Sequence, residues 1–553
     1  MIKKMSQFFL FLLVIVLFSA FLKAENNTPR LTNPINIKTL TSEEKLGQIL
    51  MYPIDIDNTH KYKDAIKKGI IGNVIILWGS YSFEDTKNLI KKLQGWASES
   101  PRKIPLLIAI NYEGSTVFTP VTLGLLQLPT NMQIAASNDT QNTARLFYLA
   151  GKEMKRAGFN INFAPVVDVN TNSNNPVIGL RSFGSYYKNV AKMSSAVING
   201  LQASGVIAVA KHFPGHGNTS KDSHYSLPYT NLSKEELQKH LYPFKKAIQS
   251  QVGGIMSAHV VYPNLDPKYP ATFSKKILTN LLKKEMNFKG IIISDSLDMK
   301  GATKGQGHIE ASTLSLQAGA DMLIVGKYNP EKTFKKLKKL IGTEISAKRL
   351  HQASKKIIEA KNEIFYHQWD KLNGYEINKA YDKVAQNITN KAITLIKDEQ
   401  NILPLAKNGD TEDKLKVCSV FFVPSRFSEF LTNFKKPFLA SGIELDYYNA
   451  FVRPNYKDYN RARKCVKNAD VTVIGSFQMN AKPISSQVKY INKLIDLGKP
   501  VILVSLMSPY DILHYPNAKT VMAIYGITKY SSKSLSEVLL NGKALGKFPV
   551  EIN

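Results

Sequence analysis

Side chains that can move protons are concentrated in one short stretch of the sequence. The run Lys211-His-Phe-Pro-Gly-His-Gly217 is followed, after a polar loop, by Asp222-Ser-His224. Asp222 and His224 alternate with Ser223, so in an extended segment both side chains point to the same side. A carboxylate beside an imidazole fixes its tautomer and supports its charged form, and histidine titrates near neutrality. The pair is a candidate general acid/base; the structural alternative is a solvated loop with incidental Asp and His.

A candidate nucleophile lies further along the chain, at the end of an apolar run. Residues 290–294 read Gly-Ile-Ile-Ile-Ser and lead into Asp295, which the small Ser296 follows. A lone carboxylate at a strand end can attack an electrophilic carbon. The structural alternative is that Asp295 caps a following helix. Asp298 is a weaker candidate because it falls in the turn beyond the strand.

The same histidines raise the question of metal binding. His212 and His216 have a His-x₃-His spacing that also occurs in zinc sites, and Asp222 and His224 could add ligands. Lys211 would repel a cation, and the Pro-Gly pair between the two histidines argues against a helix there. The sequence therefore predicts no metal site, with activity that is insensitive to chelators. Chemistry by a nucleophile and an acid/base also needs no organic cofactor.

The hydrophobic pattern from about residue 36 to 365 predicts the scaffold that positions these residues. Short apolar segments alternate with amphipathic helical stretches, at 47–52, 73–77, 106–111, 161–167, 206–210, 254–260, 290–294 and 321–325. This alternation predicts a (β/α)₈ TIM barrel, whose chemistry belongs at the C-terminal strand ends. Polar residues occur there, namely Asn111, Glu113, Asp168, Lys211, His212, His259 and Asp295.

A second α/β pattern follows the barrel. Residues 366–380 break the periodicity and are predicted as a linker. The domain over 381–553 begins with a helix at 379–391 and has strands at 393–396, 416–423, 470–475, 500–505 and 520–525. Helices between these strands predict a C-terminal α/β sandwich with a mainly parallel sheet.

The motifs resemble glycoside hydrolase family 3, specifically its bacterial β-N-acetylglucosaminidase branch. The matching segments occur in the family's order at 162–170, 175–184, 211–217, 222–224, 256–260, 294–300, 499–505 and 546–550. The resemblance implies that Asp295 is the nucleophile of a retaining mechanism, His224 the acid/base and Asp222 its orienting carboxylate. It also implies a set of sugar-binding residues, namely Lys211, His212, Arg181, Asn111 and His259. For Arg181 the structural alternative is a salt bridge that holds its loop.

The third strand departs from the family pattern Asp-Gln-Glu-Gly-Gly-x-Val-x-Arg. This chain has Asn111 in place of the aspartate and Thr119 in place of the arginine. Asparagine can still bond to a sugar hydroxyl, but without charge assistance, which roughly halves the strength of the bond. Threonine cannot reach as arginine does. The resemblance therefore indicates the reaction type, while the identity of the sugar stays open.

The N-terminal residues 1–24 have the pattern of a secretory signal peptide. Lys3 and Lys4 precede an almost wholly apolar run from Phe8 to Leu22, and Ala24 ends a possible cleavage site. The run is short for a membrane span of about 20 residues, and no cysteine follows it for lipid attachment. The sequence predicts export to the periplasm or the medium, with an uncleaved membrane anchor as the alternative.

Charge and cysteine content limit the partners. The chain of 553 residues has a formal net charge of +30, and its 73 basic residues are mostly lysine and form no single block. Arginine is preferred for reading bases and phosphates, so no nucleic-acid partner is predicted, whereas association with anionic envelope polymers fits. Cys418 and Cys465 are too few for a disulfide framework; their pairing and the oligomeric state stay open.

These observations predict an exported two-domain retaining glycosidase. Its predicted substrate is a small saccharide derived from peptidoglycan, from which it removes terminal N-acetyl-β-glucosaminyl residues through an intermediate on Asp295. A phosphorylase is one alternative, because a neutral histidine repels phosphate less than a carboxylate does. A β-glucosidase-like activity is a second. A weakened polysaccharide-binding protein is a third, suggested by Asn111 and Thr119. The second domain is expected to serve packing, dimerisation or cell-wall contact.

Overall fold

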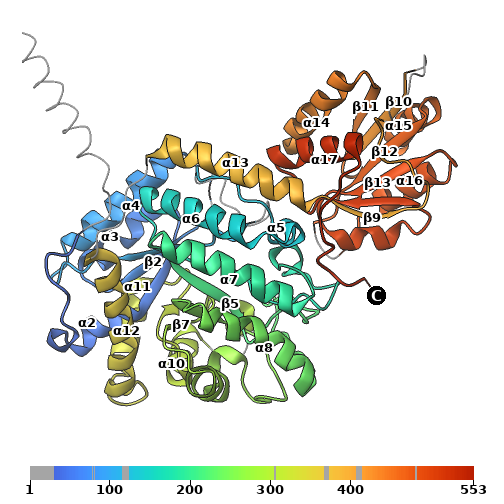
Figure 1. Cartoon of the computed structure of the whole chain (residues 1–553). Coiled ribbons are helices and arrows are strands. Elements are labelled where there is room, and N and C mark those ends of the chain that lie inside the picture. Colours follow the sequence, from blue (N-terminus) through green and yellow to red (C-terminus); the bar gives the residue numbers. More distant parts are fainter. Residues whose placement is uncertain are drawn as a thin grey trace, which may run out of the picture.

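The computed structural model describes residues 30–77, 79, 81–114, 124–303, 307–366, 373–406, 414–479 and 482–552. A larger N-terminal unit, blue to yellow in Figure 1, is followed by a smaller orange to red one. The predicted signal peptide and Thr119 lie outside the described residues. Among the helices that are described, none combines the length and the apolar character that a membrane crossing requires.

The N-terminal unit is a barrel of eight parallel strands in the order β7-β6-β5-β4-β3-β2-β1-β8. A parallel bridge between Ile293 and Met322 joins the two ends of this sheet, and Ser294 N donates to Met322 O at 3.0 Å. The predicted TIM barrel is confirmed. The strands are β1 (Leu50–Ile54), β2 (Asn73–Ile76), β3 (Leu107–Ile110), β4 (Ile161–Asn162), β5 (Ile207–Phe213), β6 (Gly254–Ser257), β7 (Ile291–Ile293) and β8 (Leu323–Ile324).

One strand prediction began too early. The segment predicted as a strand at 47–52 starts inside α2 (Ser42–Ile49), and β1 begins only at Leu50. Thr41 and Glu44 form a capping box that starts the helix, and Leu46 and Ile49 lie on its buried face. A short apolar run cannot separate a buried helix end from a strand, which accounts for the error.

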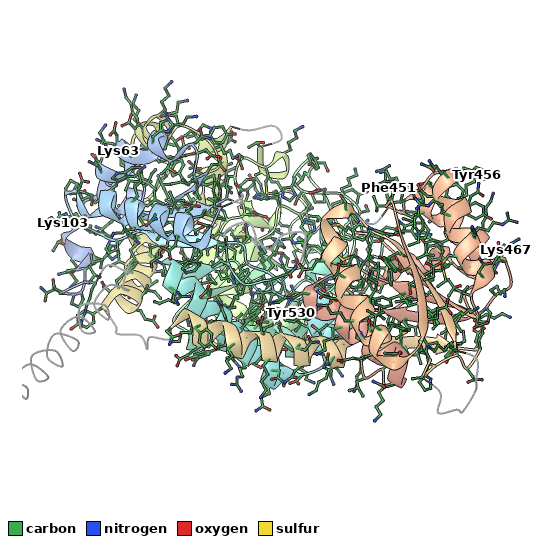
Figure 2. All side chains as sticks on the ribbon, turned by 90° about the horizontal axis from the view of Figure 1, so that it is seen from above. Lys63, Lys103, Phe451, Tyr456, Lys467 and Tyr530 are labelled. Atoms are coloured by element: carbon green, nitrogen blue, oxygen red, sulfur yellow. A yellow bond between two sulfur atoms is a disulfide. The ribbon has the colours of Figure 1, made fainter. Side chains whose placement is uncertain are left out.

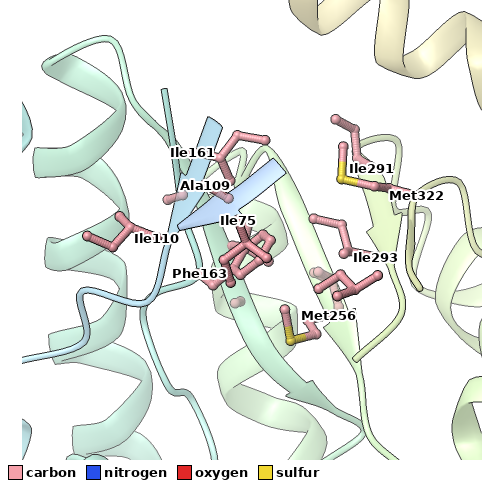
Figure 3. Close-up of a cluster of buried hydrophobic side chains, with 14 of the residues drawn as sticks. Ile75, Ala109, Ile110, Ile161, Phe163, Met256, Ile291, Ile293 and Met322 are labelled. Carbon is pink, nitrogen blue, oxygen red and sulfur yellow. The ribbon is translucent and has the colours of Figure 1, made fainter. Parts of the chain in front are cut away.

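Apolar side chains fill the barrel. Figure 3 shows Ile75, Phe163, Met256 and Ile293 gathered between the strands, whereas Ile110 lies on the other side of β3, toward the surrounding helices. All five are buried. This filling makes the barrel a packed core with fixed strand ends.

Helices surround the barrel in the alternating order that was predicted. Several begin with a capping box, as Ser82 and Asp85 do for α4 and Ser233 and Glu236 do for α8. The helices are α3 (Lys63–Lys67), α4 (Phe83–Ser98), α5 (Asn131–Ser137), α6 (Thr140–Ala157), α7 (Tyr187–Ala203), α8 (Lys234–Gln249), the π-helix η6 (Lys276–Glu285), α9 (Lys300–Thr303), α10 (His308–Ala318), α11 (Pro330–Lys338) and α12 (Ala347–Tyr366).

The second unit contains a six-stranded sheet in the order β11-β10-β12-β13-β14-β9. All pairs are parallel except β9 with β14, so the predicted mainly parallel sheet is confirmed. The strands are β9 (Thr394–Asp398), β10 (Lys416–Phe422), β11 (Glu444–Ala450), β12 (Val471–Ser476), β13 (Val501–Ser505) and β14 (Thr520–Ala523). The helices are α14 (Ser428–Ser441), α15 (Tyr456–Asn468), α16 (Ser485–Ile495), the short η8 (Pro509–His514) and α17 (Lys529–Asn541).

Two features of this domain were not predicted. Strand β11 lies at the sheet edge and is mostly exposed, so its sequence has no apolar run that would mark a strand. Cys418 of β10 and Cys465 of α15 form a disulfide, with their Cα atoms 5.8 Å apart.

Helix α13 (Gly374–Ala392) joins the two units and differs from the predicted linker over 366–380. It begins at Gly374, because the Asn373 side chain accepts from Glu376 N and caps the helix. The Asn-Gly pair that looked like a break is therefore a helix start. Helix α13 packs on α5 and α6 of the barrel and on α17 of the second domain (Figure 1). Figure 2 places Tyr530 of α17 between the two bodies, and its hydroxyl donates to Asp382 of α13.

Candidate active site

A cavity of about 440 Å³ opens at the C-terminal ends of the barrel strands. Most of the predicted catalytic and sugar-binding residues line it, namely Asn111, Arg181, Lys211, His212, His224 and Asp295. The lining includes neither Asp222 nor His259. The structure therefore gathers residues from distant strand ends around one space, as a barrel active site requires.

Asp295 follows β7 and has an anchored carboxylate. Ser296 N donates to Asp295 Oδ1 at 2.7 Å. Burial acts to raise the pKa of Asp295, but the imidazoles of His259 and His212 and the Ser296 N–H together hold it below its ordinary value. The first described helix after Asp295 is α9 at Lys300–Thr303, so the carboxylate caps no helix. Asp295 is thus an ionised carboxylate facing the cavity.

Asp222 and His224 meet by a different geometry from the extended segment that was expected. The chain turns here, with Tyr225 N and Ser226 N both donating to Asp222 O. Asp222 Oδ1 accepts from His224 N at 2.9 Å and lies 2.7 Å from His224 Nδ1. An aspartate that bonds to the backbone two residues on forms an Asx turn. Because Nδ1 is engaged by Asp222, Nε2 is the ring nitrogen left to face the cavity.

Glu113, like Asp168, was noted at a strand end in the sequence analysis but was not assigned a role in the site. Its carboxylate accepts from Arg181 Nε at 2.8 Å and Arg181 Nη2 at 2.9 Å, and Lys211 Nζ lies 2.5 Å from Oε1. Burial acts to raise the pKa of Glu113, but Arg181 and Lys211 hold it far below its ordinary value. The signal was its place just after β3, beside Asn111.

Lys211 and Arg181 therefore both pair with Glu113 and also line the cavity. Lys211 Nζ also donates to Asn111 Oδ1 at 2.9 Å. The ion pair considered as the alternative for Arg181 is present, and the same side chain lines the cavity. A charged group fixed by a buried carboxylate keeps its orientation when a ligand enters.

Asp168 fixes His212, which adjoins Lys211 in β5 and also lines the cavity. His212 Nδ1 lies 2.8 Å from Asp168 Oδ2, and His216 N donates to Asp168 Oδ1 at 2.6 Å. His212 can therefore present Nε2 to the cavity. Burial lowers the pKa of His216 to about 4, and its ring contacts the Ser223 and Thr219 hydroxyls. Over the described residues, no three His, Cys, Asp or Glu side chains are grouped so as to hold a metal ion.

His259 lies behind the cavity lining. Its Nε2 contacts Ser296 O at 3.0 Å, and its Nδ1 contacts Thr272 Oγ1 at 2.9 Å. Burial lowers the pKa of His259, which favours a neutral ring that donates to the Ser296 carbonyl. The structure thus places this predicted sugar-binding residue as a support for the turn that carries Asp295.

Asp298 is occupied by structural bonds. Its Oδ1 accepts from Ser296 Oγ at 2.7 Å, and its Oδ2 accepts from Lys327 N at 3.1 Å. These bonds tie the turn after β7 to the end of β8. The carboxylate is therefore committed to holding that turn, in contrast to Asp295.

Comparison with known proteins decides the family. Residues 41–360 match the glycosyl hydrolase family 3 N terminal domain. The chain belongs to glycosyl hydrolase family 3. β-Hexosaminidase A of Pseudoalteromonas piscicida is 28% identical over 536 residues, which cover 84% of this chain and 86% of the relative.

Two solved structures are similar to this chain over nearly its whole length. A family 3 β-N-acetylglucosaminidase from Paenibacillus sp. str. FPU-7 superposes with a TM-score of 0.79 at 28% identity, covering 93% of this chain and 99% of the other. A β-glucoside phosphorylase has a TM-score of 0.76 at 23% identity, covering 93% of this chain and 95% of the other. The second similarity concerns the fold alone. The protein is a family 3 glycosidase with the barrel as its family domain.

Proposed function

We propose that this glycosidase is a retaining β-N-acetylhexosaminidase that acts on terminal N-acetyl-β-glucosaminyl residues. The observation that carries the proposal is that Asp295 and His224 line one cavity together with Arg181 and Lys211, while Asp222 contacts His224 Nδ1. The relatives named β-hexosaminidase and β-N-acetylglucosaminidase support the choice of sugar.

In the first step Asp295 attacks the anomeric carbon. A new bond forms between its carboxylate oxygen and that carbon, and the glycosidic bond breaks. His224 gives its Nε2 proton to the departing oxygen, so the leaving group departs as a neutral alcohol. Asp222 favours the charged imidazolium that must exist before this transfer and keeps Nδ1 protonated throughout.

In the second step water releases the sugar. Neutral His224 takes a proton from water while the water oxygen bonds to the anomeric carbon and the bond to Asp295 breaks. Both residues return to their starting states, so the cycle consumes only water and the glycoside. Arg181, Lys211 and Asn111 are the groups that would hold the sugar hydroxyls during both steps.

The biological substrate in this proposal is a fragment of peptidoglycan, and the mature protein acts outside the cytoplasm. The net charge of +30 favours residence near anionic envelope polymers. Residues 1–24 are proposed to be removed as a signal peptide. Edman or mass-spectrometric determination of the N-terminus tests this; a mature start near Glu25 is expected, and an intact Met1 on membrane-bound protein contradicts it.

A phosphorylase is the second candidate, and one observation favours it. The proposed acid/base is a histidine, so after the first step the attacking molecule meets a neutral imidazole, and the negative charge lies behind it on Asp222. Phosphate in place of water would give a sugar 1-phosphate. Product analysis with and without phosphate separates the two: free N-acetylglucosamine in both conditions supports hydrolysis.

The deciding experiment compares turnover of a chromogenic N-acetyl-β-glucosaminide with the matching β-glucoside. The proposal expects kcat/KM to be higher for the N-acetyl substrate. Preference for the glucoside would indicate a β-glucosidase, and binding of either sugar without turnover would indicate a polysaccharide-binding protein.

A further inference from the structure

One edge of the catalytic cavity rests on the second domain. Tyr510 of η8 donates its hydroxyl proton to Asn170 O at 3.3 Å and accepts from Asn170 Nδ2 at 3.1 Å. Leu180, a barrel residue, packs within the hydrophobic core of the second domain. Ser185 N donates to Pro549 O at 3.1 Å. The second domain thus contacts the barrel loop over 170–185 at its start, near its middle and at its end.

From Asn170 one set of contacts leads to the sugar-binding side. Gly179 N donates to Asn170 Oδ1 at 3.3 Å, and Gly179 begins the short helix η4 (Gly179–Arg181). Asn170 N donates to Gly184 O at 2.9 Å and so closes the base of the same loop. Arg181, at the end of η4, lines the cavity and pairs with Glu113. The placement of Arg181 therefore depends on Asn170.

A second set of contacts leads to the acid/base side. Asn172 Nδ2 donates to Thr219 O at 3.1 Å, and Asn175 Nδ2 donates to His216 O at 2.9 Å. Gly217 approaches so closely that an added Cβ would lie 1.9 Å from Val169 O. The segment around Asn170 and the loop 216–219 are therefore bound together. That loop leads directly into Asp222 and His224.

Tyr510 itself does not line the cavity and so cannot touch a sugar there. The residue is 6% exposed, and in the described part of the chain its hydroxyl bonds to Asn170. Burial raises the pKa of Tyr510 to about 12, so the hydroxyl stays neutral and keeps its donor proton at physiological pH. Because Tyr510→Phe keeps the ring, any effect of removing the hydroxyl on catalysis must pass through Asn170.

We propose that Tyr510 is a positioning residue, through which the second domain sets the placement of both Arg181 and the Asp222–His224 pair. The inference rests on the proposed function only in assigning sugar binding to Arg181 and proton transfer to His224. It gives the second domain a role beyond the packing, dimerisation or wall contact expected from sequence. A small misplacement of groups that hold or protonate a substrate is enough to slow a reaction about 100-fold.

The test compares Tyr510→Phe with Tyr515→Phe in the full-length mature chain. Tyr515 is a matched control, because it is 4% exposed, follows η8 and packs in a cluster made only of second-domain residues. We expect Tyr510→Phe to raise KM several-fold and to lower kcat about tenfold for a glycoside with a poor leaving group. An aryl glycoside with a good leaving group should lose much less. Tyr515→Phe should match wild type on both substrates.

A purely structural role predicts a different pattern. If Tyr510→Phe lowers the melting temperature but leaves KM, kcat and the leaving-group dependence unchanged, the inference is wrong. Asn170→Ala approaches the same contact from the barrel and should reproduce the kinetic pattern. The double variant should lose less than the sum of the two single losses, because both variants remove the hydrogen bond between Asn170 Nδ2 and the Tyr510 hydroxyl. Fully additive losses would overturn the inference.

Failure of the proposed function is visible separately, in the wild type. A wild-type enzyme that prefers a glucoside or uses phosphate removes the proposed specificity, and the four variants are then compared on that substrate. Equal kinetics for wild type, Tyr510→Phe and Asn170→Ala on it would still overturn the positioning role.

Discussion

The side chains of Glu113, Arg181 and Lys211 are 1%, 9% and 3% exposed, whereas that of His224 is 50% exposed and that of Asp222 24%. The first group, the buried ion cluster, joins three strand-end segments of the barrel through multiple charged bonds. The second, the proposed acid/base pair, lies on one turn, where Asp222 Oδ1 is 2.7 Å from His224 Nδ1. The cavity therefore has a buried wall, formed by the ion cluster, and a solvent-exposed wall, formed by the pair.

This difference suits two different tasks. Groups that hold a sugar gain from fixed orientation and low dielectric, because each hydrogen bond is then stronger and needs no rearrangement. A group that gives a proton to the leaving group and then takes one from water in each cycle needs solvent access. Asp295 lines the same cavity as both groups, and Ser296 N anchors its carboxylate there.

The largest expected effect comes from replacing Asp295, the proposed nucleophile at this cavity. Asp295→Asn should lower kcat/KM by roughly 10³-fold or more, because the carboxamide fills the same space but cannot attack the anomeric carbon. Steady-state assays on an unactivated N-acetylglucosaminide, with circular dichroism as a fold control, measure this. Wild-type turnover by this variant would exclude Asp295 as the nucleophile.

The next effect distinguishes the exposed pair from the buried ion cluster by its dependence on the leaving group. His224→Ala should lower kcat/KM by roughly 10²–10⁴-fold for poor leaving groups and much less for aryl glycosides that need no protonation. Asp222→Ala should follow the same trend less steeply. Neither variant should change the melting temperature much, because the pair is exposed. Equal losses on every substrate would show that these residues bind sugar or hold structure.

The buried ion cluster should respond in stability as well as in activity. Glu113→Gln leaves Arg181 and Lys211 buried without their countercharge, which should lower the free energy of unfolding by about 3–5 kcal/mol. A matched control is Glu44→Gln, because Glu44 makes a similar two-bond contact to Arg102 on the surface. There the loss should be about 1 kcal/mol or less. Urea unfolding of both variants measures whether the buried ion cluster stabilises the fold as much as its contacts indicate.

The same cluster sets a direction for pH dependence. The pKa of Glu113 is depressed, so its contribution to stability is fully present above the unfolded value near 4.5 and is lost as the pH falls. Glu113→Gln should therefore lower the melting temperature at pH 7 and progressively less as the pH is brought below 4.5. A difference between variant and wild type that stays constant with pH would mean that the carboxylate charge is not what stabilises the cluster.

The scaffold was predictable from the sequence because its signals are local. Parallel strands buried on both faces give continuous apolar runs, as at 73–77 and 290–294, and the polar residues that end them mark the catalytic face. Asp295 and Lys211 were found in this way. Edge strand β11 was missed because its alternating, exposed residues lack such a run.

The contacts within the site were not predictable because they join distant positions. Glu113 was visible as a polar strand end, but its pairing with Arg181 and Lys211 depends on how three barrel segments converge. His259 and Lys211 both occur near the C-terminal end of a barrel strand, so the sequence does not separate their roles. Only the fold shows that His259 contacts Ser296 O behind the cavity lining. The Asp222–His224 contact was anticipated, while the turn that forms it was not, because an Asx turn competes with extended backbone over the same spacing.

The smallest expected effect concerns a second buried carboxylate, in the C-terminal domain. Asp511 accepts from Ser476 Oγ at 2.7 Å, and within the described part of the chain it forms no ion pair with a cationic side chain. Burial raises the pKa of Asp511 to about 7, the opposite direction from Glu113. Stability from this group is therefore full below its unfolded value near 4 and is lost as the pH rises through about 7. Asp511→Asn should raise the melting temperature at pH 8 by a few degrees and have little effect at pH 4.5. Destabilisation at pH 8 equal to that at pH 4.5 would mean that Asp511 is held as a carboxylate, and that a buried charge in this protein needs no cation beside it.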